Sequence, residues 1–89
     1  MLRIQLATAC KRDLRRLDKQ GKDKSKFSEV VALLQAGETL PKRYQDHVLQ
    51  GEWRGYRDLH IEPNWVLIYK ISGGDLHLAR TGSHPEVFG

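Results

Sequence analysis

The hydrophobic and polar positions of the first 37 residues change from a strand period to a helix period. Residues 2–6 alternate between apolar and polar, as in a half-buried strand. Two apolar stripes with helical spacing follow: Ala7, Cys10, Leu14 and Leu17, and then Phe27, Val30, Val31 and Leu34. Gly21 and Gly37 lie just beyond these stripes, where glycine commonly ends a helix. The pattern predicts one strand followed by two helices.

The pattern becomes that of a sheet after Pro41. Strand candidates cover residues 47–50, 53–61, 65–71 and 76–80, separated by turn residues. Residues 65–71 are apolar on both faces, as in a central strand that is covered on both sides. We therefore predict one domain over residues 1–89 with an α+β fold: strand, helix, helix, and then a mainly antiparallel sheet with the helices on one face.

Composition places the chain among soluble globular domains. Hydrophobic residues make up 39% and charged residues 29%, and the single Cys10 excludes an internal disulfide. No apolar run reaches the roughly 18 residues of a membrane span, and the first residues do not resemble a secretion signal. We expect a cytoplasmic protein that does not associate with membranes.

Positive charge is concentrated at the start of the chain. Residues 1–26 contain nine Lys or Arg and three Asp, whereas residues 27–89 contain six against eight acidic residues. Four of the basic residues form a stripe on the predicted first helix, opposite its apolar stripe: Arg12, Arg15, Arg16 and Lys19. We interpret this stripe as an RNA-binding surface. The alternative is a solvated helix face.

Three of the four histidines are expected at one edge of the sheet. His47 opens a predicted strand, His60 closes one, and His84 follows the last strand. Strand ends meet at the edge of a small sheet, so these rings can converge and exchange protons near neutral pH. The alternative is that they are ordinary surface or capping histidines. His77 lies in mid-strand and is expected to be structural or solvent-facing.

An arginine and an aromatic residue accompany these histidines. Arg80 is predicted on the same face as the leucines of the last strand, where its guanidinium needs an anion. That anion is either a phosphate or a carboxylate, Glu62 or Asp58. Phe88 either fills the end of the core or stacks on a nucleobase.

The sequence predicts neither a metal site nor a cofactor. It contains no CxxC or HxxxH spacing, no Gly-rich phosphate loop and no nucleophile elbow, and Cys10 lies in an apolar helix stripe. Histidines with one arginine suit RNA cleavage, because the ribose 2′-OH is an internal nucleophile. The protein then has only to remove one proton, deliver another and stabilise the phosphate charge.

Several motifs, in the same order, closely resemble the YafQ branch of the RelE/ParE toxin superfamily. They are Gln45–Gly51, Trp53–Asp58, His60–Pro63, Trp65–Lys70 and Arg80–His84, with Phe88 at the end. The resemblance implies the small RelE-like fold and a type II toxin that cuts mRNA in the ribosomal A site and is held inactive by a cognate antitoxin. We expect the other partners to be mRNA and the ribosome, at the A site of the 30S subunit and its rRNA. It also implies that His47, His60 and His84 are active-site histidines, Arg80 contacts phosphate and Phe88 is the C-terminal aromatic.

Asn64 departs from the family pattern, which commonly has a catalytic aspartate at this position. An amide does not exchange a proton at neutral pH, although Asn64 can still orient the scissile phosphate. Either proton transfer is redistributed among the histidines, or activity is attenuated. We expect metal-free cleavage with His84 as the base and His60 or His47 as the acid. The alternatives are a non-cleaving binder, such as a ParE-like topoisomerase poison or a ribosome binder, and an unrelated RNA-binding module.

Overall fold

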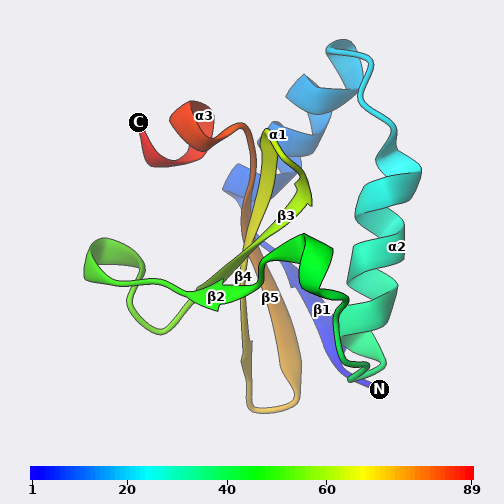
Figure 1. Cartoon of the computed structure of the whole chain (residues 1–89), viewed down its shortest axis with the longest axis vertical. Helices are drawn as coiled ribbons and strands as arrows, with labels where there is room; N and C mark the ends of the chain where they lie inside the picture. The colour runs from blue at the N-terminus through cyan, green and yellow to red at the C-terminus, as the bar shows by residue number, and fades with distance from the viewer.

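The computed structural model describes all residues from 1 to 89 (Figure 1). The elements, in order, are β1 (Arg3–Leu6), α1 (Thr8–Lys19), α2 (Lys24–Gln35), η1 (Lys42–Tyr44), β2 (His47–Val48), η2 (Gly51–Trp53), β3 (Arg57–Glu62), β4 (Trp65–Ser72), β5 (Asp75–Gly82) and α3 (His84–Phe88). None of the helices has the length and apolar character that crossing a membrane requires.

The five strands form one sheet in the order β1-β5-β4-β3-β2. β1 pairs with β5 in parallel, and the other three pairs are antiparallel. Ile68 pairs with Arg80, but the next residue, Tyr69, pairs with Leu78. Ala79 is therefore an extra residue, and this β-bulge changes the face to which the end of β5 presents its side chains.

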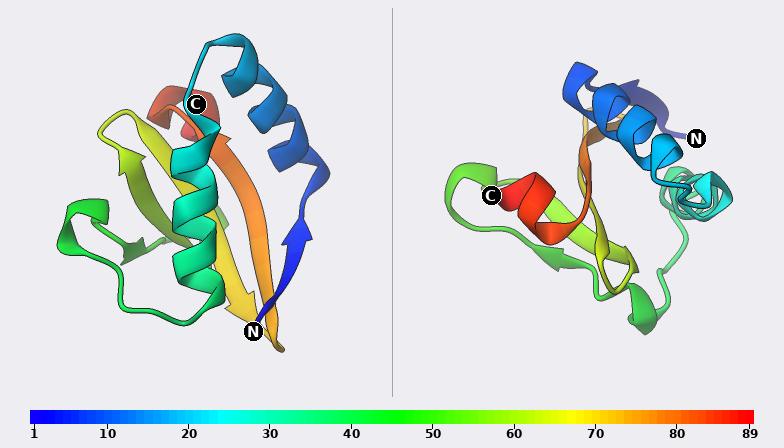
Figure 2. Two further views of the ribbon diagram at one scale, coloured as in Figure 1. Left: turned by 90° about the vertical axis from the view of Figure 1, so that its right-hand side faces the viewer. Right: turned by 90° about the horizontal axis from the view of Figure 1, so that it is seen from above.

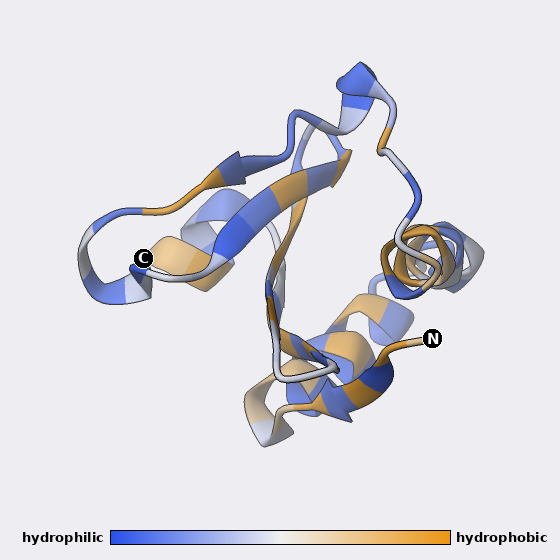
Figure 3. Ribbon diagram, turned by 90° about the horizontal axis from the view of Figure 1, so that it is seen from below, coloured by the Kyte–Doolittle hydropathy of each residue, from blue (hydrophilic) through white to orange (hydrophobic).

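α1 and α2 cover one face of the sheet, as predicted. Their buried residues, among them Leu17, Val30 and Leu34, pack with Trp65 and Leu67 of β4 in the main core. Figure 3 shows the apolar side of α2 turned toward the strands. The α+β class, the mainly antiparallel sheet and the positions of both helices are confirmed.

The opposite face carries a second, smaller core. Val66 and Ile68 of β4 pack there against Ala79 and against Val87 of α3. Figure 2 shows α3 on the other side of the sheet from α1. The sequence pattern predicted no helix after the last strand, so α3 and its position on this second face were missed.

Two predicted strands are shorter in the structure. The strand predicted over 47–50 has only two residues, His47–Val48. The strand predicted over 53–61 begins at Arg57, because η2 and a turn occupy the residues before it. Gly51 and Gly55 have φ angles of 69° and 94°, which are not compatible with an extended strand.

Candidate active site

The three predicted histidines gather around one buried carboxyl group, that of Asp58. His47 on β2 pairs directly with Asp58 on β3, and its Nδ1 lies 3.3 Å from Asp58 Oδ1. His60 is two residues further along β3 and so presents its ring on the same face. His84 is the first residue of α3, which packs on that face. The structure thus brings together side chains from β2, β3 and α3.

The electrostatics of Asp58 reflect this arrangement. The residue is only 2% exposed, and this burial raises the pKa of the carboxyl above its usual value. The charges of His47, His60 and His84 lower the same pKa and offset part of the rise. Each ring is therefore close enough for its charge to affect the pKa of Asp58. The carboxyl and the three rings form one electrostatically connected group.

The backbone just before β2 fixes the orientation of the His47 ring. His47 Nδ1 lies 2.8 Å from the carbonyl oxygen of Gln45. A carbonyl oxygen only accepts hydrogen bonds, so Nδ1 carries a hydrogen and Nε2 is the nitrogen left for chemistry. Gln45 has a φ of 49°, the one left-handed conformation among the non-glycine residues. That strained conformation directs its carbonyl toward the ring.

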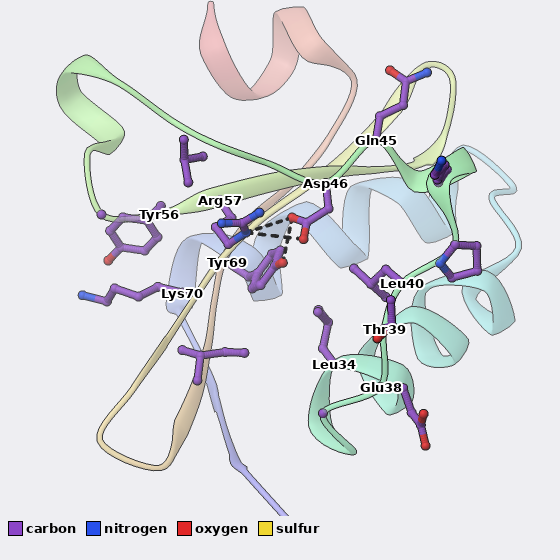
Figure 4. Close-up of a pocket in the computed structure, with 16 residues that line it drawn as sticks. Leu34, Glu38, Thr39, Leu40, Gln45, Asp46, Tyr56, Arg57, Tyr69 and Lys70 are labelled. Carbon is purple, nitrogen blue, oxygen red and sulfur yellow. Dashed lines mark hydrogen bonds and ion pairs between the residues drawn. The ribbon is translucent and has the colours of Figure 1, made fainter.

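Asp46 anchors the same segment to the sheet. Its carboxylate accepts hydrogen bonds from Arg57 Nε at 3.2 Å and from the Tyr69 hydroxyl at 2.8 Å (Figure 4). Burial and the neighbouring Asp46 raise the pKa of Tyr69, which keeps its hydroxyl proton for this bond. The largest cavity, about 800 Å³, lies beside this network, and none of the histidines lines it. Asp46 therefore positions β2, and with it His47.

The structure pairs Arg80 with a residue that the sequence analysis did not suggest. Its Nε and Nη2 lie 2.6 and 3.1 Å from the carboxylate oxygens of Asp13 on α1. The expected carboxylate partners were wrong: Glu62 pairs with Lys22 and Lys26, and Asp58 with His47. The expected face was also wrong, because the bulge at Ala79 sets Arg80 opposite Ile68 rather than in line with the leucines of β5.

Asp13 is the centre of a clamp that joins α1, β5 and α3. Besides Arg80, it accepts hydrogen bonds from Arg16 Nη1 at 3.0 Å and from the backbone N–H of Thr81 at 3.1 Å. Burial by itself would raise the pKa of Asp13. The hydrogen-bond donors lower it by more than burial raises it, so the pKa of Asp13 lies below its usual value. Arg16 Nε also lies 3.1 Å from Glu86 on α3. The Asp13 clamp thus fixes α3 relative to the sheet.

α3 presents His84 and Phe88 side by side. Ser83 accepts a hydrogen bond from the Glu86 backbone N–H, and the Glu86 side chain accepts one from the Ser83 backbone N–H. This capping box stabilises a helix of only five residues. The rings of His84 and Phe88 are 4.5 Å apart at an angle of 42°. Phe88 is half-buried against the second core, so it both packs and leaves part of its ring accessible beside His84.

The basic stripe on α1 is only partly available. Arg12, Arg15 and Lys19 are exposed and form no ion pair or side-chain hydrogen bond. Arg16 instead points inward to the Asp13 clamp. The three exposed basic residues form a row along α1. The neighbouring row consists of Asp13, Arg16 and Gln20, which contact Arg80 or α3.

Asn64 lies apart from any hydrogen-bonded network. It is exposed in the turn between β3 and β4. The carboxyl among the histidines is Asp58, whose role the sequence analysis missed. Its position two residues before His60 on a strand was the available signal. Asp13 was missed as well, although it falls at helical spacing between the apolar Cys10 and Leu17.

Comparison with known proteins shows the family. Residues 2–89 match the profile described as "Bacterial toxin of type II toxin-antitoxin system, YafQ". The chain belongs to the YafQ family. The mRNA interferase toxin YafQ of Escherichia coli K12 is 41% identical over 87 residues, which cover 97% of this chain and 95% of the relative. The resemblance read from the sequence is therefore confirmed.

Solved structures of bacterial toxins share the whole fold. A copper-bound mutant toxin from Helicobacter pylori superimposes with a TM-score of 0.95 at 38% identity, covering 99% of this chain and all of that one. YafQ in the E. coli DinJ–YafQ complex superimposes with a TM-score of 0.91 at 39% identity, covering both chains completely. A second structure of that pair is described as a toxin–antitoxin complex.

Proposed function

We propose that this YafQ-family toxin is a ribosome-dependent mRNA endoribonuclease that inhibits translation. The observation that carries the proposal is the convergence of His47, His60 and His84 around Asp58, on the face to which Arg80 and α3 belong. The activity named for the 41%-identical E. coli relative, mRNA interferase, supports it. A protein that only binds the ribosome or a topoisomerase does not need three proton-exchanging rings at one place.

The proposed cleavage uses the 2′-OH of the RNA as nucleophile. His84 removes the proton from the 2′-OH, the 2′-oxygen attacks phosphorus, and the bond to the 5′-oxygen breaks as His60 or His47 protonates that oxygen. The products are a 2′,3′-cyclic phosphate and a free 5′-OH. Arg80 stabilises the phosphate charge. Asp13 binds two of its nitrogens, which leaves Nη1 to meet the phosphate.

Two further residues have supporting roles in this proposal. Phe88 lies beside His84 with part of its ring accessible, as required for stacking on a base next to the scissile bond. Asn64 is exposed at the β3–β4 turn and donates a hydrogen bond to the RNA backbone rather than a proton. Because an amide replaces an acid there, we expect slower cleavage than in relatives with the aspartate.

The proposed mechanism does not draw on a metal ion. Two Helicobacter pylori neighbours are described as copper-bound and metal-bound toxins. In this chain, no three His, Cys, Asp or Glu side chains come together in a metal-ligating group. Cys10 is buried in the main core, where burial raises the pKa of its thiol to about 12 and keeps it protonated. We therefore derive the mechanism from the histidines and Arg80 alone.

The proposed partners follow from the family and from the charge distribution. We propose that a cognate antitoxin protein inactivates this chain, as the complex of DinJ with E. coli YafQ illustrates. We also propose that Arg12, Arg15 and Lys19 contact rRNA phosphates, because their charges are exposed and unpaired.

Primer extension on mRNA from cells that express the protein tests this function. We expect cuts at one fixed position within codons. These cuts should disappear when the ribosome-binding site of the message is removed. DNA supercoiling by gyrase is assayed in the same cells. Loss of supercoiling without mRNA cuts would instead identify a topoisomerase poison and contradict the proposal.

A further inference from the structure

Two aromatic residues on the second face have polar atoms that the fold does not use. The other tryptophan and the other two tyrosines are buried, and each has its N–H or hydroxyl in a hydrogen bond within the protein: Trp65, Tyr44 and Tyr69. Trp53 and Tyr56 are only half-buried, and neither side chain forms a hydrogen bond. Their polar atoms are not enclosed either, so both can meet a ligand.

The turn around η2 holds both rings in place. Gly51 and Gly55, with φ angles of 69° and 94°, fold the chain tightly on either side of Trp53. The Tyr56 backbone N–H donates to the Trp53 carbonyl at 2.9 Å, and the Leu49 backbone N–H donates to the Tyr56 carbonyl at 3.0 Å. The two rings lie 5.2 Å apart at 83°, edge to face. Because the fold already fixes these rings, a ligand that binds them needs little further ordering of the protein.

A lysine adds positive charge beside the two rings. Lys70 Nζ lies 4.7 Å from the centre of the Tyr56 ring, and Lys70 forms no ion pair. Arg54 is exposed and unpaired as well, and its charge offsets that of Glu52, the only acidic residue of the turn. Aromatic rings next to an unneutralised cation bind single-stranded nucleic acid, because a base stacks on a ring while the cation meets a phosphate. We call Trp53, Tyr56 and Lys70 the aromatic platform.

The aromatic platform lies on the face of the sheet that carries the histidines and Arg80. In β4, Lys70 is two residues beyond Ile68, so the two side chains point to the same face about 7 Å apart. Ile68 pairs with Arg80. On the other side of Ile68, Val66 pairs with Gly82, from which the chain enters α3. Figure 2 shows η2 and α3 on the same side of the sheet. Arg80 thus lies between α3 and the aromatic platform along this face.

We propose that the aromatic platform is a nucleotide-binding subsite, which holds the RNA nucleotide that flanks the scissile phosphate on the side away from Phe88. The base stacks on Trp53, with which the Tyr56 ring packs edge to face, and Lys70 meets the phosphate of that nucleotide. This inference rests on the proposed RNA cleavage and extends it beyond the histidines. Since every base has a π face, the aromatic platform adds affinity for RNA without selecting the codon.

Tryptophan fluorescence tests the inference directly. Trp65 is fully buried, so RNA bound at the surface should quench Trp53 alone. The probe is a short RNA with 2′-O-methyl groups, which lacks the nucleophile and is not cut. We expect quenching in the wild type at the RNA concentrations that raise the anisotropy of a dye-labelled copy of the probe. Trp53→Leu should abolish the quenching and weaken RNA binding about 10-fold, whereas Trp53→Phe, which keeps a stacking ring, should bind RNA nearly as well as the wild type.

Lys70→Gln tests the contribution of charge, with Lys42→Gln as the matched control. Lys42 is exposed on η1 and forms no ion pair, so the two substitutions change the net charge equally. Lys70→Gln should lower the steepness of log K against log salt by about 0.7, the value for one phosphate contact on a single strand. Lys42→Gln should leave that slope unchanged.

Cleavage kinetics separate this role from a packing role. Trp53→Leu should raise KM for a ribosome-bound message about 10-fold with kcat unchanged, because the aromatic platform holds the RNA equally before and during the reaction. Leucine remains apolar, and the melting temperature of each variant reports whether the fold is intact. Equal loss of RNA affinity in Trp53→Phe and Trp53→Leu would show that Trp53 only packs, and would overturn the inference.

The outcomes distinguish this inference from the function on which it rests. Absence of quenching in the wild type, together with wild-type RNA affinity of Trp53→Leu, would overturn the subsite and leave the nuclease intact. Quenching and Trp53-dependent RNA binding, without cleavage of any message by the wild type, would overturn the nuclease function and leave the aromatic platform as an RNA-binding surface.

Discussion

Two buried aspartates show how their neighbours decide what a carboxyl does. Asp13 and Asp58 are each 2% exposed. Asp13 accepts hydrogen bonds from two arginines and a backbone N–H, and its pKa falls below the usual value. Asp58 has only histidine charges to offset its burial, and its pKa rises. The first stabilises the fold, whereas burial of the second as a charged group costs stability.

Asp58→Asn should stabilise the protein near neutral pH. Because the folded-state pKa of Asp58 is raised, the folded protein holds this proton more tightly than the unfolded chain does. The resulting stabilisation is complete below the unfolded value, near 3.8, and is lost as pH rises through the raised folded value. Asn does not ionise, so the variant should melt a few degrees above wild type at pH 7, about 1 kcal/mol, and show no advantage near pH 3.5. Melting curves that differ equally at both pH values would contradict this.

At the residue scale, the candidate chemistry was readable from the sequence but its geometry was not. His47, His60 and His84 were selected from their places relative to predicted strands. The role of the Gln45 carbonyl depends on a single left-handed backbone conformation, which no apolar pattern encodes. Asp58 lies beside His47 because the two residues are paired across β2 and β3. The register of such a strand pair follows from tertiary packing.

At the element scale, the Asp13 clamp is what places α3. A five-residue helix is too short to be stable alone, so its position depends on contacts with the rest of the chain. It was also too short to show an apolar period, although Ser83, Pro85 and Glu86 form a recognisable helix start. The bulge at Ala79 was equally unreadable, because one extra residue reverses the alternation on which the expected face of Arg80 was based. By contrast, both long helices had full apolar stripes and were predicted correctly.

Asp13→Asn should release α3 and weaken the fold. Arg80 and Arg16 would lose their shared counter-charge, at a cost of about 2–3 kcal/mol, less than for a fully buried pair because both arginines reach solvent. Hydrogen exchange should show lost protection in α3 before the rest of the sheet, and RNA cleavage should fall with it. Asp18→Asn on the same helix, where the aspartate forms an exposed pair with Lys24, is the control and should behave as wild type. Unchanged protection of α3 in Asp13→Asn would show that the second core alone holds this helix.

At the scale of the whole molecule, only some of the basic residues in the first 26 are free to bind a partner. Much of the positive charge of residues 1–26 is neutralised within the fold: Arg3 pairs with Asp75, Lys24 with Asp18, and Lys22 and Lys26 with Glu62. The unpaired charge that remains lies on α1, in Lys11, Arg12, Arg15 and Lys19. The last three lie next to the row that contacts Arg80 and α3. The free charge and His84 are thus connected through the same clamp.

Reversing Arg12 and Arg15 to Glu should weaken ribosome binding without unfolding the protein. Loss of these phosphate contacts should lower the steepness of log K against log salt by about 1–2. Lys24→Glu with Lys42→Glu makes the same change in net charge at exposed sites elsewhere and is the control. Equal effects of the two pairs would show that α1 acts only through net charge, and no effect of either would leave it a solvated helix face.

The most direct test of the central claim is cleavage of a ribosome-bound message that carries a single 2′-deoxy nucleotide at the scissile position. We predict that the all-RNA message is cut to a 2′,3′-cyclic phosphate in the wild type, that His84→Ala cuts it about 10²–10⁴-fold more slowly, and that the 2′-deoxy message stays intact in both. Cutting of the 2′-deoxy message at the wild-type rate would show that the ribose hydroxyl is not the nucleophile, and would contradict the account.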